Sequence, residues 1–190
     1  MIPPSRPNLT REALLERIKQ THPAWEPLPF FIAGIRGYYR DSMGSVGRND
    51  RGIYDDAIFL VTPEAFAAFN ANTDPSAFRP ATASRKGMAV LQPGIWDVYR
   101  FDTHNGTFAH PAICQRLGLV TVDRDGTGPD TGQFGINIHR GGTRGTSSEG
   151  CQTIPPAQWD AFYNLAKSEA VRLWGNPGYK RQRITYVLLS

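Results

Sequence analysis

Short apolar runs separated by turn residues fill the middle of this chain, and they constrain its fold more than any other feature. The runs are rich in β-branched and aromatic residues and are bounded by Gly, Pro, Asn or Asp. Runs of this kind are typical of β-strands that end in turns, so we predict a sheet assembly. The predicted strands lie within residues 29–39, 53–61, 87–102, 117–126, 134–139 and 183–190. Pro93 and Gly94 divide the longest run into two strands.

Helical periodicity appears near both ends of the chain. Apolar residues recur at helical spacing in residues 10–20 and again from 156 to 174, which predicts two amphipathic helices. In residues 62–70, Thr62 and Pro63 occupy the cap and first position of a third, shorter predicted helix. The expected fold class is therefore mainly β with flanking helices, that is, α+β.

Length and composition favour a single domain. The chain has 190 residues, of which 40% are hydrophobic and 20% charged, and this is enough to bury one core. We expect one domain over residues 1–190, in which residues 1–25 form an N-terminal helical extension.

The formal charge of +4 favours anionic surroundings, such as nucleic acid, acidic lipid or an anionic cell-wall polymer. The 21 Lys and Arg residues are scattered and match no nucleic-acid-binding motif, so we expect no nucleic-acid partner. No stretch approaches the ~18 consecutive apolar residues of a membrane span, so we expect no membrane association.

Two cysteines, Cys114 and Cys151, are present, and their spacing does not suggest a disulfide framework. His139 precedes Cys151 by 12 positions, at the end of a predicted strand. A lone cysteine or histidine is more often a packing residue, but a thiol close to an imidazole can lose its proton to it and become a nucleophile. Gly150, which has no side chain, would let the backbone N–H groups of Gly150 and Cys151 face a developing oxyanion.

The segments IHRGG and TSSEGCQTI, within residues 134–154, resemble the catalytic signature of the L,D-transpeptidase (YkuD-type) domains. In that family a histidine after a β-strand precedes a Ser/Thr-x-Gly-Cys segment. The resemblance is weaker in VLQPGIWDVYRFD and does not extend to the first 80 or so residues. It implies a mixed β-sheet or sandwich domain that acts on peptidoglycan stem peptides through a cysteine thioester.

The same resemblance implies a role for each residue of the motif. Cys151 would be the acylated nucleophile and His139 its base, oriented by the backbone carbonyl of Arg140. The backbone N–H groups of Gly150 and Cys151 would donate to the oxyanion. Ser148 would be the small hydroxyl residue at the start of the loop that carries Cys151, which we call the cysteine loop.

The chain departs from the family pattern around the cysteine, which makes it a divergent member. Glu149 stands where many members have a second histidine, and Gln152 and Thr153 replace the usual Arg or Asn after the cysteine. Because these positions fall where the thioester would be resolved, the departures permit a different acceptor. Glu149 is expected to point outward or to pair with Arg140 or Arg144, and we count it among the substrate-binding residues.

Arg36, Tyr38 and Arg40, in the segment GIRGYYRD, form a polar and aromatic cluster. Either they belong to a solvated loop or they form a substrate wall, in which an arginine meets a peptide carboxylate. We predict the substrate wall.

Metal binding has two weaker signals in the sequence. His104, His110 and Cys114 lack the paired spacing of a zinc site. Residues 122–132 (VDRDGTGPDTG) lack the closing Glu of a calcium loop and are expected to form a β-turn loop beside the site. We expect neither a metal nor a cofactor.

These observations favour a peptidoglycan stem-peptide hydrolase, either an L,D-carboxypeptidase or an L,D-endopeptidase. One alternative is a transpeptidase that cross-links or exchanges D-amino acids. Another is a non-catalytic cell-wall-binding or virion-structural module. The start of the sequence has no apolar segment typical of a signal peptide. We therefore expect a monomer that is made in the cytoplasm and delivered to the periplasm or cell wall by another route. It would be a phage lysis protein or a secreted antibacterial effector. Its partner would be delivery machinery or an immunity protein.

Overall fold

The computed structural model describes residues 1–105 and 109–190, and most of its regular structure is β. Its helices are α1 (Arg11–Thr21), α2 (Pro156–Trp174) and a 3₁₀ turn, η1 (Gly178–Arg181). Its strands are β1 (Phe31–Ile35), β2 (Asp56–Val61), β3 (Phe66–Ala71), β4 (Ala89–Leu91), β5 (Gly94–His104), β6 (His110–Gln115), β7 (Val120–Arg124), β8 (Gly128–Gly132), β9 (Ile138–Arg140), β10 (Gln152–Ile154) and β11 (Ile184–Leu189).

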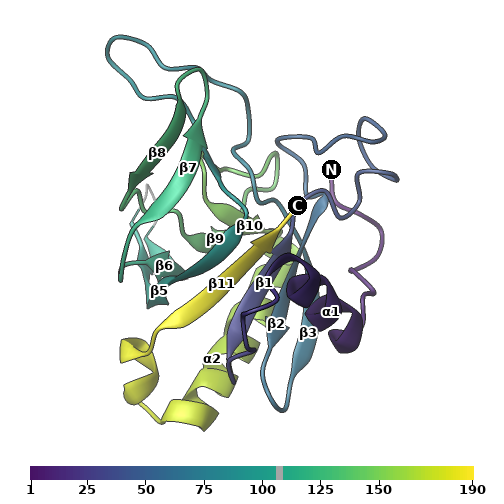
Figure 1. Cartoon of the computed structure of the whole chain (residues 1–190), viewed down its shortest axis with the longest axis vertical. Coiled ribbons are helices and arrows are strands. Elements are labelled where there is room, and N and C mark those ends of the chain that lie inside the picture. The colour runs from purple at the N-terminus through teal and green to yellow at the C-terminus, as the bar shows by residue number, and fades with distance from the viewer. Residues whose placement is uncertain (106–108) are drawn as a thin grey trace.

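Among the described residues, eight strands form one mixed sheet in the order β10-β9-β6-β5-β11-β1-β2-β3, and β4-β7-β8 form a second, smaller sheet (Figure 1). The pairs β1–β11 and β9–β10 are parallel, and the other pairs are antiparallel. The predicted α+β class, with a mixed sheet and flanking helices, is confirmed.

The central strands are buried on both faces, which explains why they read as continuous apolar runs. In β1, Ile32 faces the larger core, whereas Phe31 and Ala33 face a smaller core on the other side of the sheet. The same alternation continues in β2 and β11. The sheet therefore needs an apolar cover on each face.

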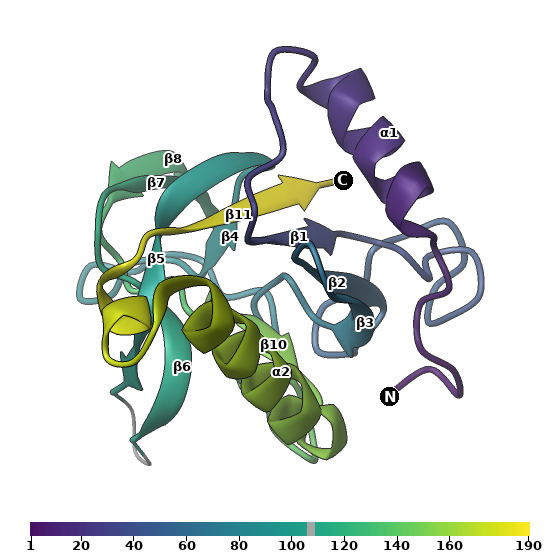
Figure 2. The same cartoon turned by 90° about the horizontal axis from the view of Figure 1, so that it is seen from below.

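The two α-helices provide these covers from opposite sides of the sheet (Figure 2). Helix α2 packs Phe162 and Ala166 into the larger core. Helix α1 starts at Thr10, whose side chain accepts a hydrogen bond from Ala13 N–H at 3.2 Å. Its buried residues Leu14 and Ile18 complete the smaller core. Residues 10–20 and 156–174 are thus helical much as predicted.

The predicted helix at residues 62–70 is wrong, because this segment forms a tight turn and strand β3. Ala65 N–H donates to Thr62 Oγ1 at 3.0 Å, which is the bond that a helix cap would make. Thr62 N–H, however, donates to Ala65 O at 2.8 Å and turns the chain back. Phe66 then pairs with Val61 across the hairpin. The hydrogen bond expected of a helix cap does form, but pairing with β2 outweighs the helical propensity of this segment.

The two edge strands of the large sheet approach one another. Asn72, directly after β3, exchanges two backbone hydrogen bonds of 2.8 Å with Thr153 of β10. The sheet therefore curves until its edges meet. Within the described residues, neither helix has the length and apolar character to cross a membrane.

Residues 122–132, which were expected to form a β-turn loop, form a β-hairpin whose turn lies at residues 125–127. Val122 pairs with Asp130 between β7 and β8, and β4 pairs with β7 on the other side. The small sheet built in this way stands beside the end of the large sheet that carries β9 and β10 (Figure 1).

Candidate active site

Cys151 and His139 lie together in a cleft of about 890 Å³. His139 comes from strand β9 and Cys151 directly precedes β10, and these two short strands are parallel neighbours. Residues 85–89 and 134–137 contribute further walls. The sequence thus places the two reactive side chains 12 positions apart, and the pairing of β9 with β10 brings them to one site.

The thiol of Cys151 is held in its protonated form. Sγ donates to Gly135 O at 3.3 Å and accepts from Asn137 N–H at 3.4 Å. Burial raises the pKa of the Cys151 thiol to about 11, the Asn137 N–H opposes this shift, and the charge of Glu149 adds to it. Cys151 therefore rests as a thiol, which needs a base before it can act as a nucleophile.

His139 is neutral and its tautomer is fixed. Its Nδ1 lies 2.7 Å from the carbonyl oxygen of Arg140, the contact that the family resemblance implies. Because a carbonyl only accepts, Nδ1 carries the proton and Nε2 keeps a lone pair. Burial, and then the neighbouring His104, lower the pKa of His139 to about 3. A neutral imidazole with a free nitrogen is the state in which histidine can accept a proton from a thiol.

Ser148 organises the cysteine loop. Its Oγ donates to Cys151 O at 2.7 Å and accepts from Gly150 N–H at 2.9 Å. The loop is anchored from outside as well, because Ser148 N–H donates to Ser76 Oγ at 2.7 Å. The expected position of Ser148 at the start of the loop thus has a structural basis.

Gly150 does not have the role that was expected for it. Its N–H donates to Ser148 Oγ and so is already engaged, rather than facing the cleft as an oxyanion donor. Glycine is required here for space, since the residue has a φ of +156° and a Cβ would lie 2.6 Å from Ala89 O. The backbone N–H of Cys151, in contrast, donates to no described residue.

Glu149 lies on the rim of the cleft and pairs with Arg79 at 2.5 Å, not with the expected Arg140 or Arg144. Gln152 and Thr153, which also depart from the family pattern, are fully buried in β10. The Gln152 side chain bonds Gly150 O at 3.1 Å and the Tyr186 hydroxyl at 3.1 Å. Of the three departures, only Glu149 therefore lines the cleft.

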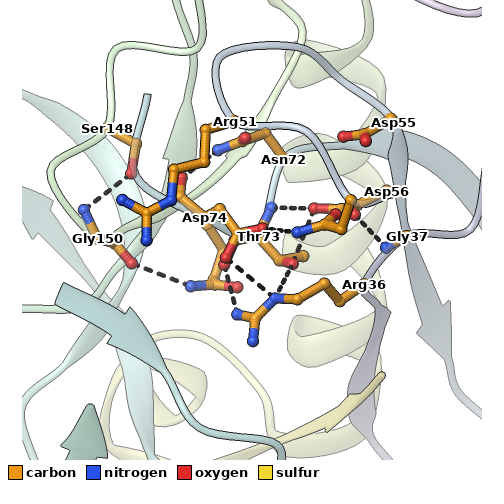
Figure 3. A network of polar contacts seen from close by, with 12 residues as sticks. Arg36, Gly37, Arg51, Asp55, Asp56, Asn72, Thr73, Asp74, Ser148 and Gly150 are labelled. Carbon is orange, nitrogen blue, oxygen red and sulfur yellow. Dashed lines mark hydrogen bonds and ion pairs between the residues drawn. The ribbon is translucent and has the colours of Figure 1, made fainter. Parts of the chain in front are cut away.

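The structure does not bring the predicted substrate wall to Cys151. Tyr38 and Arg40 line a separate groove beside α1 and the end of β11. Arg36 also reaches inward, where it pairs with Asp74 at 3.1 Å and donates to Thr73 O at 2.8 Å (Figure 3). These three residues follow β1, and all three line this separate groove and not the cleft that holds Cys151.

Arg36 belongs to a buried polar network that sequence reasoning missed (Figure 3). Asp56 accepts hydrogen bonds from Gly37 N–H at 2.5 Å and Thr73 Oγ1 at 2.8 Å. Burial, and then Asp74 and other acidic neighbours, raise the pKa of Asp56 to about 8. Three residues further along the chain from Thr73, Ser76 N–H donates to Ser148 O at 2.8 Å. The network therefore supports the segment on which the cysteine loop rests.

Gln115 positions residues 134–136, which line the cleft next to Cys151. Its buried Oε1 accepts the backbone N–H groups of residues 134–136 at 3.2, 2.9 and 3.0 Å. These N–H groups therefore form no backbone hydrogen bonds of a β-sheet. Of the predicted strand 134–139, only the last two residues belong to a strand, β9, which pairs with β10. The resulting turn presents Gly135 O to the thiol. Nothing in the sequence indicated that one glutamine would organise this loop.

Basic side chains dominate the cleft. Glu149 is the one acidic residue among the described residues that line it. The cationic residues, which we call the basic wall, are Arg79, Arg85, Lys86, Arg116 and Arg124. Four of the five are ion-paired: Arg79 with Glu149, Lys86 and Arg124 with Asp130, and Arg116 with Asp102. Five cations against three carboxylates still leave an excess of positive charge, which favours a substrate that carries carboxylates.

His104 also lies in the cleft, close to His139 and Cys151. A ring nitrogen of each histidine and Sγ of Cys151 lie within 4.8 Å of one another, a donor set that zinc accepts. Asn137 argues against a metal ion in this arrangement. Its Oδ1 accepts Gln115 N–H at 3.0 Å, so its NH₂ group faces His104 Nδ1 at 2.9 Å.

Because an amide NH₂ only donates, His104 Nδ1 accepts and the neutral ring carries its proton on Nε2. Neither nitrogen of His104 then has a lone pair for a metal. Cys114, which the sequence grouped with His104, is buried in β6, where burial raises its pKa to about 12. Both cysteines are free thiols.

Comparison of the chain with protein-family models, with curated proteins and with solved structures gives no match. The L,D-transpeptidase resemblance therefore rests on the residues of the chain itself.

Proposed function

We propose that this protein is a cysteine-dependent peptidoglycan stem-peptide hydrolase with an L,D-transpeptidase-like domain. One observation carries the proposal: the Cys151 thiol lies beside a neutral His139 whose tautomer leaves a nitrogen free to accept a proton, in an open cleft. The segments IHRGG and TSSEGCQTI, which resemble the family signature, support the choice of substrate.

The reaction begins when the thiol proton passes from Sγ to Nε2 of His139. Sulfur then bonds to the substrate carbonyl carbon, and the amine leaves with the proton that His139 returns. Water resolves the thioester. The side chains of Cys151 and His139 form no hydrogen bond at rest, so substrate binding must close the short gap between them.

The basic wall supports hydrolysis over transfer. A stem peptide presents carboxylates, which Arg and Lys side chains attract. The amine acceptor of a cross-linking reaction is an ammonium group before it reacts, and the same positive charges repel it. Water is not repelled, so we propose that it outcompetes the amine.

Mass spectrometry of purified tetrapeptide muropeptides tests this proposal. We expect conversion to tripeptides with release of free D-alanine, and no conversion by Cys151→Ala. Cys114→Ala is the matched control and should retain turnover, because Cys114 lies in the core of β6 and does not line the cleft.

Each alternative predicts a different product. Cross-linked dimers or exchanged D-amino acids, with little tripeptide, would identify a transpeptidase. Binding of muropeptides without any conversion would identify a non-catalytic wall-binding module.

A further inference from the structure

The reaction above leaves His104 without a role, although it lies beside both reacting side chains. Its ring stacks on that of His139, with centroids 4.1 Å apart and planes 14° apart. One of its ring nitrogens is within 4.8 Å of Cys151 Sγ. His104 ends strand β5 and lines the cleft, so a group bound to Sγ would meet it.

The two stacked histidines have opposite tautomers. Arg140 O fixes the proton of His139 on Nδ1, which leaves Nε2 as an acceptor. Asn137 fixes the proton of His104 on Nε2, which leaves that nitrogen as a donor. The site therefore contains one imidazole that can take a proton and one that can give a hydrogen bond.

The backbone alone gives an oxyanion few donors. Gly150 N–H is engaged by Ser148 Oγ at 2.9 Å, and of the N–H groups of this Gly-Cys pair only that of Cys151 has no described acceptor. Oxyanion sites usually combine two or more donors, which come from backbone or side chain. A side-chain N–H close to Sγ would complete such a site.

We propose that His104 is a catalytic residue that donates an Nε2–H hydrogen bond to the oxyanion formed as Cys151 is acylated. The inference rests on the proposed role of Cys151 as the acyl-accepting nucleophile. As the S–C bond forms, the carbonyl π electrons move onto oxygen, which accepts hydrogen bonds from Cys151 N–H and His104 Nε2–H. As the C–N bond breaks, the C=O bond reforms. His104 keeps its proton throughout.

Two substitutions separate donation from stacking. His104→Gln keeps an amide N–H donor near the position of Nε2, but it has no ring. His104→Phe keeps a ring that stacks on His139 and donates nothing. With p-nitrophenyl acetate as acyl donor, we expect the acylation rate to fall by about 10² in His104→Phe and by less than about tenfold in His104→Gln.

Alkylation of the same thiol by iodoacetamide is the control, because it forms no oxyanion. We expect both variants to alkylate within about twofold of wild type. A parallel loss of alkylation would show that His104 acts on the thiol instead. An active His104→Phe with an inactive His104→Gln would show that stacking is what matters. Either result overturns the inference.

The ester also distinguishes the inference from the function on which it rests. Wild-type protein that forms no acyl-enzyme with the ester would overturn both. Acylation of the wild type at Cys151, together with an unchanged rate in His104→Phe, would overturn the role of His104 alone.

Discussion

Cys151 and His139 rest as a thiol and a neutral imidazole, and this protonation state follows from where the chain places them. Burial works against charge on both groups, so it raises the pKa of the thiol and lowers that of the imidazole. A thiolate–imidazolium pair would need the opposite shifts. In the proposed reaction, the thiolate therefore forms only as substrate binds and His139 takes the proton.

This state predicts the pH dependence of Cys151 reactivity. With the pKa of Cys151 raised to about 11, the thiolate fraction, and with it the alkylation rate, should rise about tenfold per pH unit from about pH 6 to about pH 9. The measurement is the rate of iodoacetamide alkylation in Cys114→Ala, which leaves one thiol. A rate that is already on a plateau near about pH 6 would mean that an ion pair exists at rest and that the burial argument fails.

At the scale of elements, the sequence predicted most strands, both long helices and the meeting of His139 with Cys151. Those predictions depended on local periodicity and on the motif. The sequence predicted a helix at residues 62–70, whereas pairing of β3 with β2 makes this segment a turn and a strand despite the cap signal of Thr62. It also predicted that Arg36 lines the site, whereas Arg36 pairs with Asp74. Contacts such as that of Gln115 with residues 134–136 depend on strand order, which one sequence without its fold does not specify.

The cysteine loop gives a prediction at this scale. Ser148→Ala removes the acceptor of Gly150 N–H and the donor to Cys151 O. We expect it to lower the free energy of unfolding by about 1–3 kcal/mol and to lower kcat more than it raises KM, because the loop loses its shape.

The matched control is Ser168→Ala, on the exposed side of α2, where the hydroxyl bonds only Leu165 O among the residues that the structure describes. It should change the stability by no more than about 0.5 kcal/mol. Urea unfolding and steady-state kinetics measure both variants. An unchanged kcat in Ser148→Ala would mean that the loop holds its shape without this hydroxyl.

At the scale of the whole molecule, the two faces of the large sheet depend on helices from opposite ends of the chain. Helix α1 was expected as an extension, but Leu14 is 0% exposed and packs with Phe31 and Phe59 of the sheet. Removing α1 would expose an apolar face of β1 and β2. The first helix is thus part of the fold that supports the site.

Leu14→Ala tests this dependence. We expect it to lower the free energy of unfolding by about 2–5 kcal/mol, since it leaves a cavity under α1. Leu28→Ala, at a residue that is 46% exposed, should cost no more than about 0.5 kcal/mol. Thermal and urea unfolding give both values, and equal effects of the two substitutions would contradict a structural role for α1.

Strand β11 has a consequence for how the protein is made. It lies between β5 and β1, so the centre of the large sheet is filled by residues that the ribosome synthesises after all the other described strands. Until residues 184–189 emerge, β1 and β5 each present an unpaired backbone edge beside exposed apolar side chains. Folding is therefore completed after synthesis of this strand, and a nascent chain that stops before Ile184 becomes a substrate for chaperones and proteases.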